Sequence, residues 1–211
     1  MSKTAPFSKK LLANLKANGF EVRLAKNKAA ALKVARKIVE GAGSVGIGGS
    51  NSVREIGLYD FLCEWSKRGG RGERFINPYE DGISREENER RRKAGGQAEV
   101  FVASSNAVSE DGFLINVDGS GNRVAAQIYG PKRVLLIVGK NKIVKNVEEG
   151  FKRIEKIAAP KNVERINARA KAFGNPAAYT LKTIQNAFCV IKRCAIQGRI
   201  VIILVEEELG F

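Results

Sequence analysis

The hydrophobic residues of this chain follow two periods that alternate along the sequence. Short apolar runs, of the kind that a sheet buries on both faces, predict strands at residues 20–24, 44–47, 99–103, 113–117, 134–138 and 199–205. Apolar residues at helical spacing predict helices at residues 5–18, 28–40, 53–68, 84–93, 123–129, 147–158 and 162–172. Strands that alternate with helices in this way are typical of an α/β sandwich with a mainly parallel sheet.

Polar residues mark the beginnings of several helices. Asn27 is placed to cap the second helix, and Ser84 with Glu87 has the spacing of a capping box. Asn122 or Ser120 could cap the helix that begins near residue 123. Residues 174–198 follow neither period, so the sequence leaves the structure of that segment open.

Length and composition indicate one folded unit. The chain has 211 residues, 44% of them hydrophobic, which is enough for one substantial core. We therefore expect a single domain over residues 1–211, with N-terminal helices in residues 1–40 and a sheet core with ligand loops in residues 41–211. No apolar run is long enough to span a bilayer and no signal peptide is evident, so we expect a soluble, cytoplasmic protein with reduced cysteines.

The charged residues narrow the classes of function. The chain contains no histidine, which excludes catalytic units that depend on an imidazole and leaves acid–base chemistry to carboxylates or lysines. The net charge of +15 is compatible with a nucleic-acid partner. However, the charges are spread over helix faces, and no aromatic stacking platform or nucleic-acid motif accompanies them. A basic cradle for small acids accounts for part of the charge equally well.

Small polar residues follow four of the predicted strands. In open α/β sheets, ligands bind at the carboxyl ends of the strands. Here these ends carry loops that begin near Gly48, Ser104, Asp118 and Gly139. The strand, glycine turn and helix start over residues 113–129 would form a cradle for an anion. We therefore expect these loops to converge on one ligand.

Two glycine clusters differ in their context. Residues 41–46 match the G-x-G-x-x-G spacing but follow a helix and open a strand, which argues against a dinucleotide site. Residues 46–52, GIGGSNS, lie between a strand and a helix, so their backbone N–H groups and the hydroxyls of Ser50 and Ser52 could hold a phosphate or carboxylate. The alternative is an ordinary tight turn in which Ser50 or Asn51 caps the helix.

Polar side chains in the next two loops each allow two interpretations. Asn106 and Glu110 follow the strand VFVA, where Asn106 could bind a ligand or close an Asx-turn. Arg123 could pair with a carboxylate or phosphate while Asp118 orients it or acts as a base. Alternatively, Arg123 and Asp118 could form an intramolecular salt bridge.

The lysines and cysteines complete the set of candidate groups. Lys140 and Lys142 follow the strand at residues 134–138, where they could reach the ligand or form a solvated turn. Cys189 and Cys194 form no C-x-x-C pair, and no histidine accompanies them, so we expect no metal site.

Four segments together resemble the lactate-utilisation (LUD) domain family: GGSNSVREIGL, SSNAVSEDGFLINVDGSGNRVAAQIYGPKRVLLIVGKNKIV, AAPKNVERINA and RIVIILVEEELGF. The resemblance covers nearly the whole chain. It implies a Rossmann-like three-layer fold of the kind shared by ribose-5-phosphate isomerase, glucosamine-6-phosphate deaminase and coenzyme A transferases. It also implies a link to lactate metabolism, because some members serve in an iron–sulfur-linked system that oxidises lactate to pyruvate.

The resemblance implies a set of ligand residues as well. They are Gly48, Gly49, Ser50, Asn106, Asp118, Asn122, Arg123, Asn141 and Lys142, to which the loop pattern adds Ser52. Many relatives carry a cysteine-rich segment before the last strand, whereas residues 175–192 of this chain keep Cys189 but have Ala177, Ala178 and Lys182. This departure argues against a cofactor cluster in this chain, and an iron–sulfur cluster would lie in a partner subunit instead.

Together these features predict a LUD-type protein that binds a small anionic metabolite, either a hydroxy acid or a phosphorylated sugar. It would be accessory to lactate oxidation and work with other lactate-utilisation subunits. Residues 48–52 and Arg123 would hold the anion, and Asn106, Asp118 and Lys142 would orient or polarise it. The alternative is an isomerase or acyl/CoA-type transferase in which Asp118 or Glu110 is the base or nucleophile. A nucleic-acid-binding protein is a second alternative, and the sequence leaves a homo-oligomer open.

Overall fold

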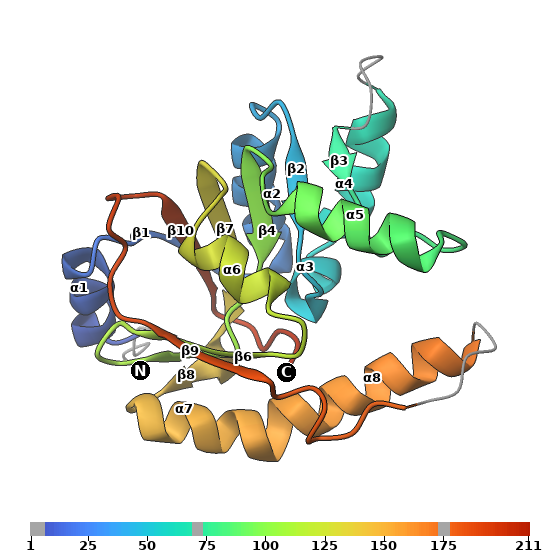
Figure 1. The fold of residues 1–211 in the computed structure, drawn as a ribbon. Coiled ribbons are helices and arrows are strands. Elements are labelled where there is room, and N and C mark those ends of the chain that lie inside the picture. The colour runs from blue at the N-terminus through green and yellow to red at the C-terminus, as the bar shows by residue number, and fades with distance from the viewer. Residues whose placement is uncertain (1–6, 69–73, 173–177) are drawn as a thin grey trace.

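The computed structural model describes residues 7–68, 74–172 and 178–211. Six strands form an all-parallel sheet in the order β1-β10-β7-β4-β2-β3 (Figure 1). In that order their bounds are Glu21–Ala25, Ile200–Val205, Arg133–Gly139, Val100–Ala103, Val45–Ile47 and Phe75–Ile76. The predicted α/β fold with a mainly parallel sheet is therefore confirmed.

The central strands are apolar without interruption because helices cover both faces of the sheet. On one face lie α2 (Lys28–Val39), α3 (Asn51–Glu55) and α4 (Leu58–Lys67), whose buried side chains share a core with alternate residues of the strands. On the other face lie α1 (Lys9–Ala17) and α6 (Asn122–Ile128), which pack on the remaining strand residues. The helix, sheet and helix layers form the expected three-layer sandwich.

The neighbouring strands β2 and β4 send the chain to opposite faces of this sheet. After β2 the chain enters α3 on one face, whereas after β4 it passes through two further strands into α6 on the other face. Loops that diverge in this way leave room at the carboxyl ends of the two strands, which is where open α/β sheets bind ligands.

A second, mixed sheet of four strands has the order β8-β5-β6-β9 (Figure 1). In that order their bounds are Ile143–Val144, Ala107–Ser109, Leu114–Asp118 and Ala187–Ile191. β6 pairs antiparallel with β5 and β9, so the prediction that places this strand in the parallel sheet is wrong. Its sequence resembles that of a parallel strand because both of its faces are buried, Leu114 in one core and Ile115 in another.

One long helical segment covers the outer face of the mixed sheet (Figure 1). It consists of α7 (Val147–Arg153), a π-helical turn (Ile154–Ala158) and α8 (Ala159–Ala172). The sequence predicts two helices separated at Pro160, and that break is absent from the structure. A proline lacks an N–H and clashes with the carbonyl four residues before it, and the wider π turn just before Pro160 accommodates both features within a continuous helix.

Local capping explains where the other helices begin and end. Asn27 caps α2 through a bond from the Ala30 N–H, and Ser84 caps α5 (Arg85–Gly95) through a bond from the Glu87 N–H, so both predicted caps are confirmed. The capping box is only half formed, because the Glu87 carboxylate accepts from Arg90 and Arg91. The single helix predicted over residues 53–68 is divided into α3 and α4 because Gly57 adopts a left-handed conformation with φ of 78°. Residues 175–177 of the segment compared with the family's cysteine-rich region lie outside the described residues.

Two further findings concern membranes and metals. Among the residues described, no helix combines the length and apolar character needed to cross a bilayer. Within the same ranges, no group of three cysteine, aspartate or glutamate side chains is arranged to hold a metal ion, and all three cysteines are free.

Candidate functional site

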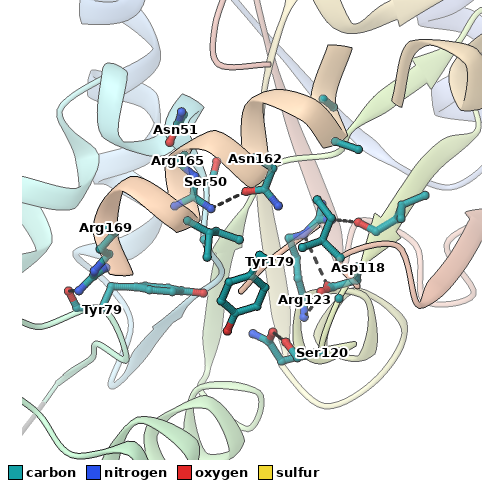
Figure 2. Close-up of a pocket in the computed structure, with 18 of the residues that line it drawn as sticks. Ser50, Asn51, Tyr79, Asp118, Ser120, Arg123, Asn162, Arg165, Arg169 and Tyr179 are labelled. Carbon is teal, nitrogen blue, oxygen red and sulfur yellow. Dashed lines mark hydrogen bonds and ion pairs between the residues drawn. The ribbon is translucent and has the colours of Figure 1, made fainter. Parts of the chain in front are cut away.

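The carboxyl ends of β2 and β4 open into a cavity of about 760 Å³. The loop around Tyr79 and the inner face of α8 also line it (Figure 2). The predicted site residues that line the cavity are Gly49, Ser50, Asn106, Asp118, Asn122, Arg123 and Lys142. Gly48 lines a smaller cavity of about 530 Å³ that shares Gly49 and Ser50 with the first. The structure therefore brings Ser50 and Arg123, which lie in separate loops, to one hollow.

The glycine loop after β2 forms a tight turn into α3. The Ser50 hydroxyl accepts the Val53 N–H at 3.3 Å and caps this helix, which corresponds to the turn alternative left open by the sequence. Steric crowding favours glycine at position 48, because a Cβ there would lie 3.2 Å from Cγ of Arg123 and 3.3 Å from Cζ of Phe101. The loop thus lets the arginine side chain pass close to the backbone.

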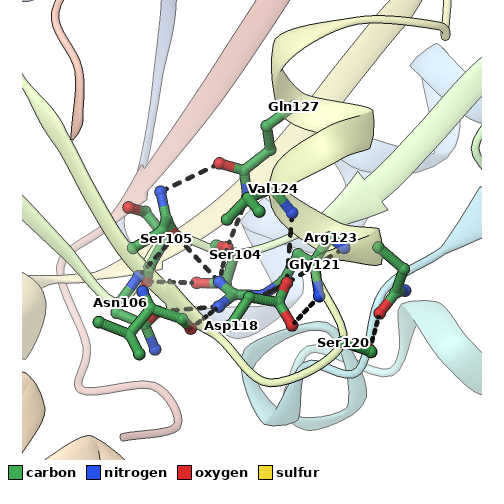
Figure 3. Close-up of polar contacts among 12 residues, drawn as sticks. Ser104, Ser105, Asn106, Asp118, Ser120, Gly121, Arg123, Val124 and Gln127 are labelled. Carbon is green, nitrogen blue, oxygen red and sulfur yellow. Dashed lines mark hydrogen bonds and ion pairs between the residues drawn. The ribbon is translucent and has the colours of Figure 1, made fainter. Parts of the chain in front are cut away.

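Arg123 joins the loop between β4 and β5 to strand β6 through hydrogen bonds of its guanidinium (Figure 3). Nη1 donates to the Ser104 carbonyl at 3.1 Å and to Oδ1 of Asn116 at 2.9 Å. Nη2 donates to Oδ1 of Asn106 at 2.9 Å and to the Val117 carbonyl at 2.6 Å. All four terminal N–H groups therefore have protein acceptors, and the direct grip on an anion expected for Arg123 has no free donor in this geometry.

Asn116 and Gln127 extend this network into the core. Both side chains are fully buried, and Nδ2 of Asn116 donates to Oε1 of Gln127 at 3.0 Å. Gln127 in turn donates to the Ser104 carbonyl at 3.3 Å. A buried polar network of this kind is stable only when its members are satisfied. Sequence reasoning missed both residues because it looked for polar side chains in the loops, whereas Asn116 lies within a strand and Gln127 near the end of a helix.

Asp118 caps α6 from four residues before its first turn. Its carboxylate accepts the N–H groups of Gly121, Arg123 and Val124 at 3.3, 3.1 and 3.2 Å. Nε of Arg123 also lies 3.6 Å from this carboxylate, so the intramolecular pair is present. The prediction that Asn122 or Ser120 caps this helix is wrong, because Oδ1 of Asn122 accepts the Ser120 hydroxyl instead.

Asn106 combines a fixed oxygen with a free amide group. Its Oδ1 accepts both the Val117 N–H at 3.0 Å and Nη2 of Arg123 at 2.9 Å, which settles the orientation of the amide. Its Nδ2 group donates to no described residue, and the side chain lines the cavity. The amide can therefore donate to a bound acceptor.

Lys142 is enclosed at the wall of the cavity. The residue is 3% exposed, and its Nζ lies 2.9 Å from Oγ of Ser52 and 3.0 Å from Oγ of Ser104. Burial, followed by the positive charges of Arg153 and Arg123, lowers the pKa of Lys142 from 10.5 to about 7, against a smaller opposing effect of Glu55. The alternative of a solvated lysine turn is thus wrong for Lys142. Ser52 is not among the residues that line the cavity, and it contacts this amine instead.

Two predicted site residues lie away from the cavity. Asn141 holds the last residues of the chain, because its Oδ1 accepts the Leu209 N–H at 3.0 Å and its Nδ2 donates to the Gly210 carbonyl at 3.3 Å. Glu110 follows β5 rather than β4, and its carbonyl accepts Nδ2 of Asn14 in α1 at 2.8 Å. Neither residue is among those that line the cavity, so the expectation that they face the ligand is wrong in this geometry.

The inner face of α8 contributes cavity residues that the sequence analysis did not select. Asn162, Arg165 and Arg169 project toward the cavity (Figure 2). Arg165 donates to Oδ1 of Asn162 at 2.6 Å, and no described carboxylate lies within ion-pair distance of it. Burial is the main effect that lowers the pKa of Arg165 from its ordinary value, although an arginine stays charged at neutral pH.

The loop around Tyr79 contacts α8, and both segments line the cavity. Arg169 donates to the Tyr79 carbonyl at 2.9 Å and pairs with Asp81 at 3.0 Å. Arg92 donates from Nη1 to Oγ of Ser120 at 3.0 Å, whereas its buried Nε has no hydrogen-bond partner in the described part of the chain. Arg92, Arg165 and Arg169 therefore give the cavity a cationic lining, in which Nε of Arg92 has no described acceptor.

Comparison with known proteins places the chain in a family. A crystal structure of a DUF162 family protein from Deinococcus radiodurans is similar, with 14% sequence identity, 93% of each chain covered and a TM-score of 0.46. No curated protein matches the chain at a significant level. The family model of the LUD domain matches residues 8–205, and because this match covers most of the sequence, the chain belongs to the LUD domain family, which is linked to lactate utilisation.

Proposed function

We propose that this LUD-domain protein binds a small anionic metabolite in the cavity, with hydroxy acids and phosphorylated sugars as the ligand classes. The observation that carries the proposal is Arg165, a partly buried cation on the cavity wall without a carboxylate partner among the described residues. Removing a charge from water without a counter-ion is unfavourable. A bound carboxylate or phosphate would neutralise Arg165 and accept its hydrogen bonds.

Other donors around the cavity support the same ligand chemistry. Nε of Arg92 is buried without a described partner, and Nδ2 of Asn106 is free to donate. The volume of about 760 Å³ lies within the range of roughly 300–1,000 Å³ that small-molecule sites occupy. A compact anion with several acceptor oxygens would satisfy donors on both walls.

Arg123 takes a different role in this proposal from the one that the sequence suggested. Its terminal donors are bound by the protein, so we assign it the positioning of Asn106 and of the loops after β4 and β6. Asp118, whose oxygens accept three backbone N–H groups, is likewise a helix cap. An isomerase or transferase reaction that uses Asp118 or Glu110 as its base therefore has little support in the geometry.

The experiment is a ligand screen by thermal shift with lactate, pyruvate, ribose 5-phosphate and coenzyme A, because a ligand of the native state raises the melting temperature. Isothermal titration calorimetry then gives the affinity of each anion that raises the melting temperature of the protein. The Arg165→Gln variant should weaken binding by about 10- to 100-fold, since a charge-assisted hydrogen bond contributes roughly 1.5–3 kcal/mol.

Lys161→Gln is the matched control for this variant. Lys161 lies on the same helix, is exposed to solvent and carries the same charge, so its replacement should leave the affinity unchanged. If none of the four anions binds, or if both variants bind equally well, the proposal is wrong. A strong salt-dependent shift with DNA or RNA probes instead would favour the nucleic-acid alternative.

A further inference from the structure

Lys142 is a chemically distinct group of the cavity. It ends the short 3-10 helix Lys140–Lys142 that follows β7, and it lines the cavity while being almost fully buried. Its neighbour Lys140, two residues before it, is exposed. Buried lysines without a counter-ion are rare, because burial of an ammonium group is unfavourable.

The hydrogen bonds around Lys142 determine what its nitrogen can do. The hydroxyl of Ser52 donates to the Leu209 carbonyl at 3.3 Å, and that of Ser104 donates to the Ile137 carbonyl at 2.6 Å. Each hydroxyl has a single proton, so both serines must accept from Nζ of Lys142. A neutral amine has two N–H groups and one lone pair. The serines occupy the two N–H groups and leave the lone pair free.

The charges around Lys142 favour this neutral form. The charged groups that face it are Arg153 of α7, Arg123 of α6 and Glu55 of α3. The Glu55 carboxylate accepts the Gly210 N–H at 3.1 Å and makes no ion pair with Lys142. With a pKa lowered to about 7, about half of the Lys142 side chains are neutral at neutral pH. An ordinary lysine, with a pKa of about 10.4, is almost entirely protonated there.

We propose that Lys142 is a nucleophilic amine that forms an imine with the carbonyl carbon of an anionic aldehyde or ketone bound in the cavity. This inference rests on the proposed function, because the anionic group of the substrate would be held by the donors of Arg165 and Arg92. It deepens that function by naming the carbonyl compounds, such as 2-oxo acids and sugar phosphates in their open form, as the substrate class.

The step balances without any further reactant. The lone pair of Nζ forms a bond to the carbonyl carbon while the π electrons of the C=O bond move to oxygen. Transfer of a proton from nitrogen to that oxygen gives a carbinolamine. Its hydroxyl then leaves as water after taking one proton from solvent, and the product is a protonated imine. No oxidant or reductant is consumed.

The experiment is chemical trapping of the imine in the full chain. The protein is incubated at neutral pH with pyruvate or with pyridoxal 5′-phosphate in the presence of cyanoborohydride, and the modified lysines are identified by peptide mass spectrometry. We expect the adduct at Lys142 to form at least about tenfold faster than at Lys140, because each unit of lowered pKa gives a tenfold larger neutral fraction until the amine is mostly neutral. The rate should rise with pH and level off above about 7.

Variants connect the adduct to the structure. Lys142→Arg keeps a cation but cannot form an imine, and Lys142→Met removes the charge; both should lose the adduct, while Lys140→Met should keep it. Circular dichroism and the melting temperature show whether each variant is folded. Arg165→Gln should lower the rate of trapping at Lys142 by at least about tenfold, in line with the loss of one charge-assisted bond.

The outcomes separate this inference from the proposed function. If anions bind in a manner that depends on Arg165 but folded protein is modified only at exposed lysines, the imine inference is wrong and the proposed function stands. If Lys142 is trapped equally well in Arg165→Gln and no anion binds, the proposed function is wrong, and the anionic substrate class fails with it.

Discussion

Arg123 and Arg165 line the same cavity from opposite walls and are bound in contrasting ways. The terminal donors of Arg123 all have acceptors within the protein, and its Nε lies beside the Asp118 carboxylate. Among the described residues, Arg165 has one hydrogen bond, to Asn162 in the same helix, and no carboxylate partner. The guanidinium with no donors left holds loops together, whereas the guanidinium with donors left can bind a ligand.

The comparison shows why residue type alone does not assign a role. Arg123 follows a glycine turn at the end of a strand, which is a typical place for an anion-binding residue, yet its neighbours supply acceptors for it. Arg165 lies in a helix with many charges, which is a typical place for a solvated side chain. The number of unoccupied donors, rather than the position in the sequence, distinguishes the two.

The largest expected effect comes from breaking the Arg123 network. Arg123→Met would remove one of the donors to each of the acceptors on Asn106, Asn116 and Ser104, and it would leave the buried Asp118 carboxylate without its cation. Loss of one partner of a buried charged pair costs roughly 3–5 kcal/mol. We expect the free energy of unfolding in urea to fall by about that amount. A loss below about 1 kcal/mol, similar to that of an exposed arginine such as Arg36, would show that the network does not stabilise the fold.

A second test uses the pH dependence of Lys142. Its pKa is about 7 in the folded protein and near 10.5 in the unfolded chain, so the unfolded chain binds more protons between these values. The free energy of unfolding of the wild type should therefore rise with pH across this window relative to Lys142→Met, by a few kcal/mol in total. Below about pH 7 the difference should stay constant. If the difference in free energy of unfolding between the wild type and Lys142→Met does not change with pH between 7 and 10.5, the buried amine does not become neutral in this range.

Asp118 offers a smaller effect that separates capping from catalysis. Asp118→Asn keeps an oxygen that can accept from the α6 backbone but loses the negative charge beside Arg123, so we expect a loss of about 1–2 kcal/mol in stability. Binding of the anion should change little. If anion affinity or turnover instead disappears while stability is unchanged, Asp118 acts on the substrate, and the isomerase or transferase alternative gains support.

The smallest effect is expected on the ligand-binding wall. Arg165→Met removes a partly buried cation that has no counter-ion among the described residues, so the free energy of unfolding should change by less than about 0.5 kcal/mol or increase. Arg165→Met and Arg123→Met are the same substitution on opposite walls of the cavity, and the losses of free energy of unfolding that they cause should differ by several kcal/mol. A loss of stability at Arg165 equal to that at Arg123 would contradict the division of roles.

Much of the fold can be predicted from local pattern. The runs at residues 134–138 and 199–205 became β7 and β10 at the centre of the parallel sheet, because a strand buried on both faces must be apolar throughout. The same rule misplaced β6, which is buried on both faces within the other sheet. β9 has alternating burial at a sheet edge, and its apolar run AFCVI was not selected as a strand from the sequence.

The site was predicted in part, for a comparable reason. Loops after β2, β4 and β6 do meet at the cavity, since strand ends at one sheet edge lie close together. The contribution of α8 was missed although a signal existed: Asn162, Arg165 and Arg169 recur at helical spacing on one face. That spacing is also typical of a solvated charged face, and only the packing of the helix over the cavity separates the two interpretations.

The chain by itself determined the α/β class, most strands, the caps at Asn27 and Ser84, and which loops carry polar residues, because each depends on interactions within a few residues. The tertiary structure decided the rest: which arginine keeps free hydrogen-bond donors, which lysine is buried away from solvent, and which helix lines the cavity opposite the strand ends. Those properties depend on the groups that distant segments bring within hydrogen-bond distance, and on how much solvent they exclude.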